Sequence, residues 1–160
     1  KATTKVYNVH LMIVHPEKYI AAFNKAGADI LTVHYEACPN LLDTLAQIKA
    51  HGMKAGVAIN PDTDIQVLKE FISEIDLVCV MTVFPGFGGQ KFIEGTYEKV
   101  IALKSIIQKA GANTLIEIDG GVSESNASAL ATAGADVLVA GTTVFKAADP
   151  IKTISQLRNC

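Results

Sequence analysis

A turn dense in glycine carries the first indication of chemistry in this chain. Three of the four residues in Gly86–Gly89 are glycine, the apolar run Leu77–Val83 precedes the turn, and a helical pattern follows it. Glycines allow backbone N–H groups to converge, and the first turn of a helix adds unpaired N–H donors and a positive dipole end. This order of elements is typical of an anion site and favours phosphate, although a single such turn would also suit a flexible loop.

Two further glycine turns follow later apolar runs. Gly120-Gly121 comes directly after Asp119, and the pair Gly141-Thr142 ends the run that begins at Val137. A carboxylate followed at once by two glycines lies where the backbone can approach a ligand closely, although Asp also serves as an ordinary turn residue. The three turns together predict one phosphate-binding site with Asp119 beside it.

Polar side chains also gather near the carboxyl ends of the predicted strands. They share one side of those strands by alternation, and they are Asn8, His10, Thr32, His34, Glu36, Asn60, Glu117 and Asp119. A lone inward histidine such as His10 is most often a hydrogen-bonded core residue. Asp119 lies on the same side of its strand, near the same rim.

A repeated junction shows which elements must position these residues. Lys25-Ala26-Gly27-Ala28 recurs with small changes at 109–112 and 132–135, where each copy ends a helical pattern at a glycine and begins an apolar strand. The predicted strands are Val6–Met12, Asp29–Tyr35, Lys54–Asn60, Leu77–Val83, Thr114–Asp119 and Val137–Gly141. The predicted helices are Pro16–Ala26, Leu41–Ala50, Asp64–Ser73, Thr96–Ala110, Ser125–Ala133 and Pro150–Leu157. Apolar strands that alternate with helices predict a parallel α/β sheet.

Side-chain alternation favours a barrel over an open doubly wound sheet. One face of the strands is almost wholly apolar, while the other carries the polar residues, which an open sheet would bury under helices at a cost. A parallel (β/α)8 TIM barrel needs eight strands, and its phosphate site follows the last ones. Because the glycine turns follow the final three strands of 1–160, we expect the last six βα units here, with the first two absent.

Composition limits the classes of partner. The chain has 160 residues, 49% hydrophobic and 19% charged, with a formal net charge of −2, which suits one packed domain without a basic surface for nucleic acid. No apolar run approaches the roughly 20 residues of a membrane-spanning helix. Cys38, Cys79 and Cys160 lack metal-ligand spacing and are interpreted as buried or free thiols. We therefore expect a cytoplasmic protein with a small-molecule substrate.

Six consecutive motifs together resemble the ribulose-phosphate 3-epimerase family over essentially the whole chain. The Pro-Gly-Phe-Gly-Gly-Gln turn and the Asp-Gly-Gly turn are the most specific of them. The motifs begin at residues 8, 32, 56, 81, 117 and 139 and read Asn-Val-His-Leu-Met, Thr-Val-His-Tyr-Glu-Ala, Gly-Val-Ala-Ile-Asn-Pro, Met-Thr-Val-Phe-Pro-Gly-Phe-Gly-Gly-Gln-Lys-Phe, Glu-Ile-Asp-Gly-Gly-Val and Val-Ala-Gly-Thr.

The resemblance implies a metal-dependent isomerase that interconverts ribulose 5-phosphate and xylulose 5-phosphate by proton exchange at C3. It implies that Asp119 is both acid/base and metal ligand, that His10 is a metal ligand, and that one divalent ion (zinc, iron, manganese or cobalt) stabilises the enediolate. Met12 and Met81 resemble the apolar wall of the family's site. In this resemblance His34 and Glu36 support the site rather than act as ligands. Substrate contacts are implied for His10, Gly86, Phe87, Gly88, Gly89, Asp119, Gly120, Gly121, Gly141 and Thr142. Family members are commonly multimeric, so a homo-oligomer is expected.

The chain also departs from the family pattern. The family's first strands carry a motif resembling His-x-Asp-x-Met-Asp-Gly, which brings a second His and Asp, and residues 1–160 contain no equivalent. If these residues were the whole polypeptide, we would expect negligible turnover and unpaired edges at Val6–Met12 and Val137–Gly141 that invite self-association. Smaller departures are Asn8, where the family usually has Asp, and Thr142, where Ser is common.

Other functions remain open at this stage. The motifs contact the phosphate and enediol ends of a sugar, so a hexulose 6-phosphate epimerase fits them as well. A lyase resembling the hexulose-phosphate synthases would share the same phosphate turns and carboxylates, whereas a Schiff-base aldolase is disfavoured because Lys54 opens its strand at the wrong end. A non-catalytic fragment is the third class.

Overall fold

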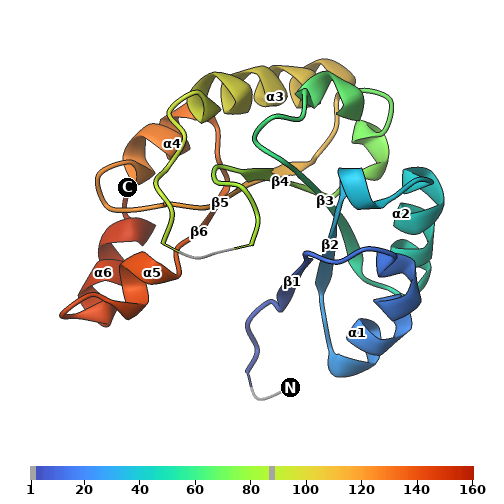
Figure 1. Ribbon diagram of the computed structural model, residues 1–160, viewed down its shortest axis with the longest axis horizontal. Helices are drawn as coiled ribbons and strands as arrows, with labels where there is room; N and C mark the ends of the chain where they lie inside the picture. The colour runs from blue at the N-terminus through green and yellow to red at the C-terminus, as the bar shows by residue number, and fades with distance from the viewer. Residues whose placement is uncertain (1–2, 87–88) are drawn as a thin grey trace.

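Six parallel strands form one curled sheet in chain order in the computed structural model, which describes residues 3–86 and 89–160 (Figure 1). Every neighbouring pair is parallel, and His10 pairs in register with Thr32 while Met81 pairs with Asp119. The strands are β1 (Asn8–Leu11), β2 (Ile30–His34), β3 (Lys54–Ile59), β4 (Leu77–Met81), β5 (Leu115–Asp119) and β6 (Val137–Val139). The predicted parallel α/β arrangement is confirmed, and its curl is that of a partial (β/α)8 barrel.

Helices cover the outer, convex side of the sheet (Figure 1). They are α1 (Ile20–Ala26), α2 (Leu41–Ala50), α3 (Thr96–Ala110), α4 (Ala127–Ala133), α5 (Thr142–Phe145) and α6 (Pro150–Arg158), with short 3-10 turns η1 (Pro16–Tyr19), η2 (Tyr35–Ala37), η3 (Ile65–Leu68) and η4 (Ile72–Glu74). Gly27, Gly111 and Gly134 end α1, α3 and α4 in the left-handed conformation, which explains the repeated Ala-Gly-Ala junction. Each of these helices returns the chain to the amino end of the next strand.

The two faces of the sheet separate two groups of core residues, as the alternation predicts. The outward residues Leu31, Val33, Val57, Ile116 and Ile118 are fully buried in one large cluster between sheet and helices. A smaller inner cluster contains Ile30, Ala58, Leu77, Cys79, Met81 and Val83. The polar side chains of the inner face therefore lie next to apolar residues, as Asp119 does beside Met81, its partner in register.

The predicted helix Asp64–Ser73 is wrong. That segment forms two 3-10 turns, η3 and η4, and the Asp64 side chain accepts a hydrogen bond from the Gln66 N–H, 2.9 Å away. The buried residues Ile65, Leu68, Ile72 and Ile75 have a spacing that also suits one face of an α-helix, so the apolar pattern predicts a helix here. Residues three apart share a face in a 3-10 turn as well, so this pattern does not distinguish the two structures.

Other boundaries differ at the ends of elements. The predicted helix Pro16–Ala26 begins as a 3-10 turn and becomes α-helical only at Ile20, and α5 after Gly141 was not predicted. Each strand is shorter by one or two residues, at one end or at both, than the apolar run that predicts it. At the carboxyl end the difference has a function, because those residues turn away to build the rim of the site.

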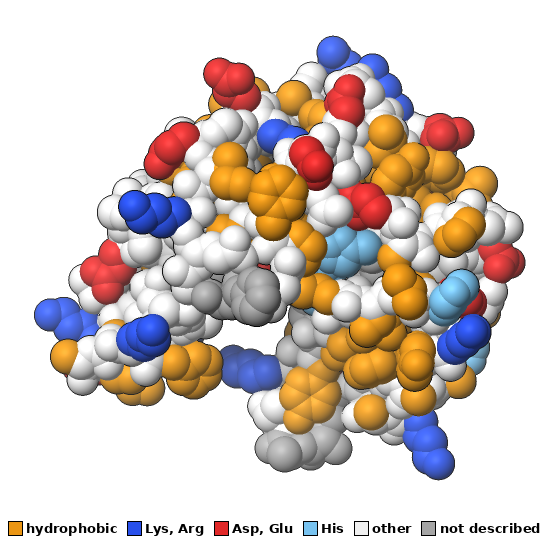
Figure 2. Space-filling view, in the orientation of Figure 1, with side chains coloured by type: hydrophobic (Ala, Val, Ile, Leu, Met, Phe, Trp, Pro, Cys, Tyr) orange, Lys and Arg blue, Asp and Glu red, His pale blue; other side chains and the backbone are white. Residues whose placement is uncertain are grey.

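The surface over the N-terminal elements carries a group of apolar side chains (Figure 2). Exposed large hydrophobic residues of this part of the chain include Val6, Met12, Ile13 and Val14. The strands β1 and β6 form the two edges of the sheet, and β6 is only partly buried. Among the described residues, no helix has the length and apolar character needed to cross a membrane.

Candidate active site

The three glycine turns line one pocket at the carboxyl ends of β4, β5 and β6. The pocket has a volume of about 440 Å³, and Met12, Met81 and Asp119 also line it. Its predicted site residues are Gly86, Gly89, Asp119, Gly120, Gly121, Gly141 and Thr142. Phe87 and Gly88, which were also predicted, lie outside the described residues. Turns that are distant in the sequence thus face one space, as the sequence predicts.

The turns pack so closely that side chains would not fit in the middle one. Gly120 has φ +124°, and a Cβ atom there would lie 2.5 Å from Val83 Cγ2. Gly121 has φ +63°, and its Cβ would lie 2.7 Å from the Phe92 backbone N. Both positions therefore require glycine for backbone conformation and for space. The Thr82 hydroxyl donates to the carbonyl oxygens of Asp119 and Gly120 and holds the turn against β4.

Gln90 closes the first glycine turn, a role that the sequence analysis missed. Its Nε2 donates to the Phe84 carbonyl oxygen at 2.7 Å, and Gln90 also lines the pocket. The first and third turns are adjacent, because a Cβ at Gly89 would lie 3.9 Å from the Thr142 hydroxyl oxygen. A glutamine directly after a glycine turn was the available signal.

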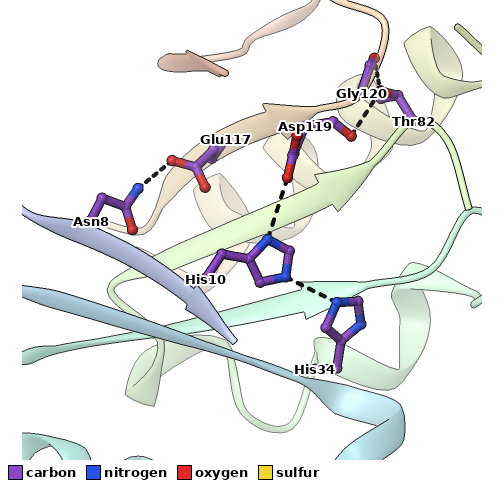
Figure 3. Close-up of polar contacts among 7 residues, drawn as sticks. All are labelled: Asn8, His10, His34, Thr82, Glu117, Asp119 and Gly120. Atoms are coloured by element: carbon purple, nitrogen blue, oxygen red, sulfur yellow. Dashed lines mark hydrogen bonds and ion pairs between the residues drawn. The ribbon is translucent and has the colours of Figure 1, made fainter. Parts of the chain in front are cut away.

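His10 and Asp119 approach each other across the inner face of the sheet (Figure 3). The distance from His10 Nδ1 to Asp119 Oδ2 is 3.4 Å, and their side chains are 14% and 25% exposed. The two residues come from β1 and β5, which are not neighbours in the sheet, so the curl of the sheet brings them together. The structure thus places the predicted histidine and carboxylate side by side.

A chain of contacts extends from His10 to Glu36. His10 Nε2 lies 2.9 Å from His34 Nε2, and His34 Nδ1 lies 3.2 Å from Glu36 Oε2 (Figure 3 shows the first of these contacts). Glu36 also accepts from the Asn60 N–H at 2.8 Å and from the Thr63 hydroxyl. Burial tends to raise the pKa of the Glu36 carboxyl, but the hydrogen bonds from His34, Asn60 and Thr63 outweigh it and lower that pKa to about 2.

A second polar group lies below the His10–Asp119 pair. The Asn8 amide donates to the carboxylate of Glu117, which is 2% exposed. Burial raises the pKa of Glu117 despite hydrogen bonds from Cys79 and Asn8. Burial likewise raises the pKa of the Cys79 thiol, and the charges of Glu117 and Asp119 raise it further. Asn8, where the family pattern has Asp, thus partners a buried carboxyl.

The His10 and Asp119 side chains fit a divalent cation. Ligand atoms of His10, Cys79 and Asp119 all lie within 4.8 Å of one another. Two tetrahedral ligands with bonds of roughly 2.1 Å stand about 3.4 Å apart, which is the His10 Nδ1 to Asp119 Oδ2 distance. Cys79 fits poorly, because a metal needs its thiolate and burial keeps the thiol protonated. The sequence interpretation of Cys79 as a buried thiol is confirmed.

The curl of the parallel sheet, the outer helices and a glycine-lined pocket beside a carboxylate place the chain in the class of β/α-barrel proteins. The profile of the Ribulose-phosphate 3 epimerase family matches residues 1–145. The chain belongs to this family.

Two relatives agree with this assignment, and a solved structure shares the fold. Ribulose-phosphate 3-epimerase of Bacillus subtilis is 50% identical over 152 residues, covering 94% of this chain and 70% of the relative. The Synechocystis enzyme of the same name is 45% identical over 159 residues, covering 98% of this chain and 69% of the relative. The crystal structure of a 3-hexulose-6-phosphate synthase shares the fold, with a TM-score of 0.69 at 24% identity over 91% of this chain and 68% of that one.

Proposed function

We propose that this protein interconverts D-ribulose 5-phosphate and D-xylulose 5-phosphate, the reaction for which its relatives are named. The observation that carries the proposal is the carboxylate of Asp119 in a pocket built from three glycine turns. A sugar phosphate needs both features, because the backbone N–H groups of the turns bind the phosphate while the carboxylate reaches the carbon to be deprotonated. The pocket volume of about 440 Å³ suits a small sugar phosphate.

The residues have separate roles in this proposal. Gly86, Gly89, Gly120, Gly121 and the Gly141-Thr142 turn bind the phosphate, and Phe87 and Gly88 are assigned to the same contact from the sequence. Met12 and Met81 form the apolar wall next to the reacting carbons. Asp119 takes the C3 proton, and the electron pair of the broken C–H bond forms the C2–C3 double bond of an enediolate.

His10 and Asp119 would hold a divalent cation, either zinc, iron, manganese or cobalt. Such an ion supplies a Lewis acid that stabilises negative charge on the sugar oxygens. The fit rests on the 3.4 Å separation of the two ligand atoms and on the place of Asp119 in the pocket lining. A cytoplasmic location and a homo-oligomeric state remain expectations from the sequence.

Inversion at C3 requires a second acid or base on the opposite face of the sugar. Among the described residues that line the pocket, Asp119 is the one carboxylate. We propose that residues 1–160 correspond to strands 3 to 8 of the family barrel, so the opposing carboxylate belongs to strands 1 and 2. The 160 residues alone should then exchange the C3 proton on one face without efficient epimerisation.

Solvent exchange and product formation together test the proposal. The protein is incubated with D-ribulose 5-phosphate in D2O, and NMR follows deuterium at C3 while a coupled assay follows xylulose 5-phosphate. We expect chelator-sensitive exchange at C3, restored by added Co²⁺ or Zn²⁺, that exceeds epimerisation at least about tenfold when the 160 residues are used alone.

The alternatives give different outcomes. Exchange with D-arabino-hexulose 6-phosphate but not with ribulose 5-phosphate would indicate a hexulose epimerase. Formaldehyde release from hexulose 6-phosphate would indicate a synthase-like lyase, an alternative that rests on fold likeness alone. Sugar phosphate binding by calorimetry without any exchange in the presence of metal would contradict the proposal and indicate a non-catalytic fragment.

A further inference from the structure

The polar contacts around His10 determine which of its ring nitrogens carries a proton. A neutral imidazole has one N–H donor and one bare nitrogen, and only the bare nitrogen binds a metal. The two nitrogens of His10 face different partners, with Asp119 on the Nδ1 side and His34 on the Nε2 side (Figure 3). The position of one proton on the His10 ring thus decides whether His10 Nδ1 can bind a metal ion together with Asp119.

The two distances around His10 are unequal. The contact between His10 Nε2 and His34 Nε2 is 2.9 Å, which is the length of a hydrogen bond, so one of the two nitrogens carries the proton. The ring centroids are 4.9 Å apart, so these nitrogens lie between the rings and point at each other. His10 Nδ1 and Asp119 Oδ2 are 3.4 Å apart, beyond the common N–H···O range of about 2.7–3.2 Å. This longer distance is expected when both atoms present a lone pair and no proton lies between them.

Glu36 decides which histidine is the donor. Its carboxylate accepts from the Asn60 N–H and the Thr63 hydroxyl through Oε1, and it is ionised at neutral pH because these bonds and His34 lower its pKa to about 2. An ionised carboxylate can only accept, so the His34 Nδ1 that faces Glu36 Oε2 carries the proton. In a neutral His34 ring, Nε2 is then bare and accepts from His10.

We propose that His34, oriented by Glu36, is a positioning residue that holds the proton of His10 on Nε2 and leaves His10 Nδ1 bare toward Asp119. The inference rests on the proposed metal site, which it deepens. His34 is 6% exposed and lies between His10 and Glu36, so its Nε2 is the acceptor that faces His10 Nε2. The segment 60–63 donates to Glu36 through the Asn60 N–H and the Thr63 hydroxyl. Lys99 holds that segment in place, because its Nζ donates to three carbonyl oxygens within it.

Nitrogen NMR of the metal-free protein tests the inference directly. The chain has 4 histidines, so ¹⁵N signals of the rings can be assigned by replacing each in turn. We expect the Nε2–H tautomer for His10 and the Nδ1–H tautomer for His34 at pH 7.5. The Nδ1–H tautomer for His10, or averaged tautomers, would overturn the inference. This result does not depend on metal or turnover, so it is distinguishable from failure of the proposed function.

Metal affinity provides a second readout. Co²⁺ titrations followed by visible absorption compare His34→Leu, which has no acceptor, with His34→Gln, whose carbonyl oxygen can accept from His10. We expect His34→Leu and Glu36→Gln to weaken Co²⁺ binding about 10- to 100-fold, while His34→Gln recovers most of the affinity. The matched control is His15→Gln, since His15 is exposed and pairs with Glu17 away from the site.

The outcomes separate positioning from a merely structural role. Equal loss in His34→Gln and His34→Leu, with both variants folded by circular dichroism, would contradict the proposal. If a variant does not fold, the tautomer of wild-type His10 still decides the question.

Discussion

Asp119 has a backbone held in place by hydrogen bonds and a carboxylate that reaches the pocket. Its carbonyl oxygen accepts from the Thr82 N–H at 2.9 Å and from the Thr82 hydroxyl at 3.0 Å, so strand β5 is held in place up to its last residue. Its carboxylate contacts His10 and reaches the pocket. In Asp119 the backbone therefore determines position, and the carboxylate is the group to which we assign the proposed proton transfer.

The Asp119→Asn variant should lose activity but keep its fold. Removing a general acid or base typically slows a reaction about 10²- to 10⁴-fold, whereas an amide can occupy the same space beside His10. We expect C3 exchange to fall by that factor and the free energy of unfolding in urea to change by less than about 0.5 kcal/mol. Asp43→Asn, at an exposed position of helix α2, is the control and should retain exchange; an equal loss there would point to unfolding.

Glu36 links the site to the stability of the molecule at acid pH. Its pKa falls from the ordinary 4.5 to about 2 in the folded chain, with His34 and the 60–63 segment as donors. The unfolded chain takes up the proton first as pH drops, so this contribution is present above pH 4.5 and is lost as pH falls toward 2. The Glu36 side chain is 30% exposed, so solvent screening limits the contribution of its ionisation to the free energy of unfolding to about 2 kcal/mol.

The Glu36→Gln variant should therefore differ from wild type mainly at neutral pH. Urea unfolding at pH 7 is expected to show the variant less stable by about 2 kcal/mol, and the difference should shrink as pH approaches 2.5. The comparison of the two proteins at each pH removes the effect of all other carboxyls. A difference that stays constant with pH would show that packing, not ionisation, explains the loss.

At the scale of elements, the glycine turns depend on close approach between segments as well as on flexible backbone. Gly121 illustrates this point, because its φ of +63° and the 2.7 Å distance from an added Cβ to Phe92 N exclude a side chain twice over. Gly52 has φ +80° with nothing within 4 Å of its Cβ, so only the conformational cost applies there. A comparison of Gly52 with Gly121 therefore separates the cost of backbone strain from the cost of steric conflict.

Replacing each glycine with alanine should give unequal results. Gly52→Ala is expected to cost about 1 kcal/mol of unfolding free energy from its positive φ. Gly121→Ala should cost at least about 1 kcal/mol more, because the Phe92 segment must shift, and it should weaken sugar phosphate binding. Urea unfolding and calorimetric titration with D-ribulose 5-phosphate measure the two effects. Equal costs would show that Phe92 moves away freely.

The whole molecule has a well-buried centre and exposed margins. Strand β4 is buried throughout, and β3 is buried after its first residue, whereas β1 and β6 lie at the edges of the sheet with partly exposed residues. Opening of a local segment costs less where fewer apolar contacts are lost. The site spans this gradient, because His10 comes from an edge strand and Met81 from the centre.

Hydrogen exchange should reveal this gradient. We expect amides of β3 and β4 to exchange more slowly than those of β1 and β6 by about 100-fold or more, with β2 and β5 between them. Exchange followed by NMR at neutral pH gives the rates. Added Co²⁺ should slow exchange in β1 if His10 binds the ion, while α2 serves as an internal reference. Uniform protection across the sheet would contradict the expectation.

Local sequence patterns were enough for most of the fold and for the shared inner face of His10 and Asp119. The junction at Lys25–Ala28 and its copies marks where helices end and strands begin, and alternation separates the helix-facing Ile116 and Ile118 from the inward Glu117 and Asp119. These signals are local, because they depend on backbone conformation and on which side of a strand a residue occupies. The helix predicted at Asp64–Ser73 was wrong because the spacing of its buried residues fits an α-helix as well as two 3-10 turns.

The sequence by itself determined that the strands are parallel, that their polar ends share one rim, and that His10 and Asp119 belong to that rim. Only the tertiary structure decided that His34 bridges His10 to Glu36, that Asn8 pairs with buried Glu117, and that Gln90 closes the first glycine turn. The physical reason is that alternation assigns a side chain to a face, whereas the curl of the sheet sets the distances between strands that are not neighbours. Those distances, a few ångströms either way, decide which polar atoms become partners.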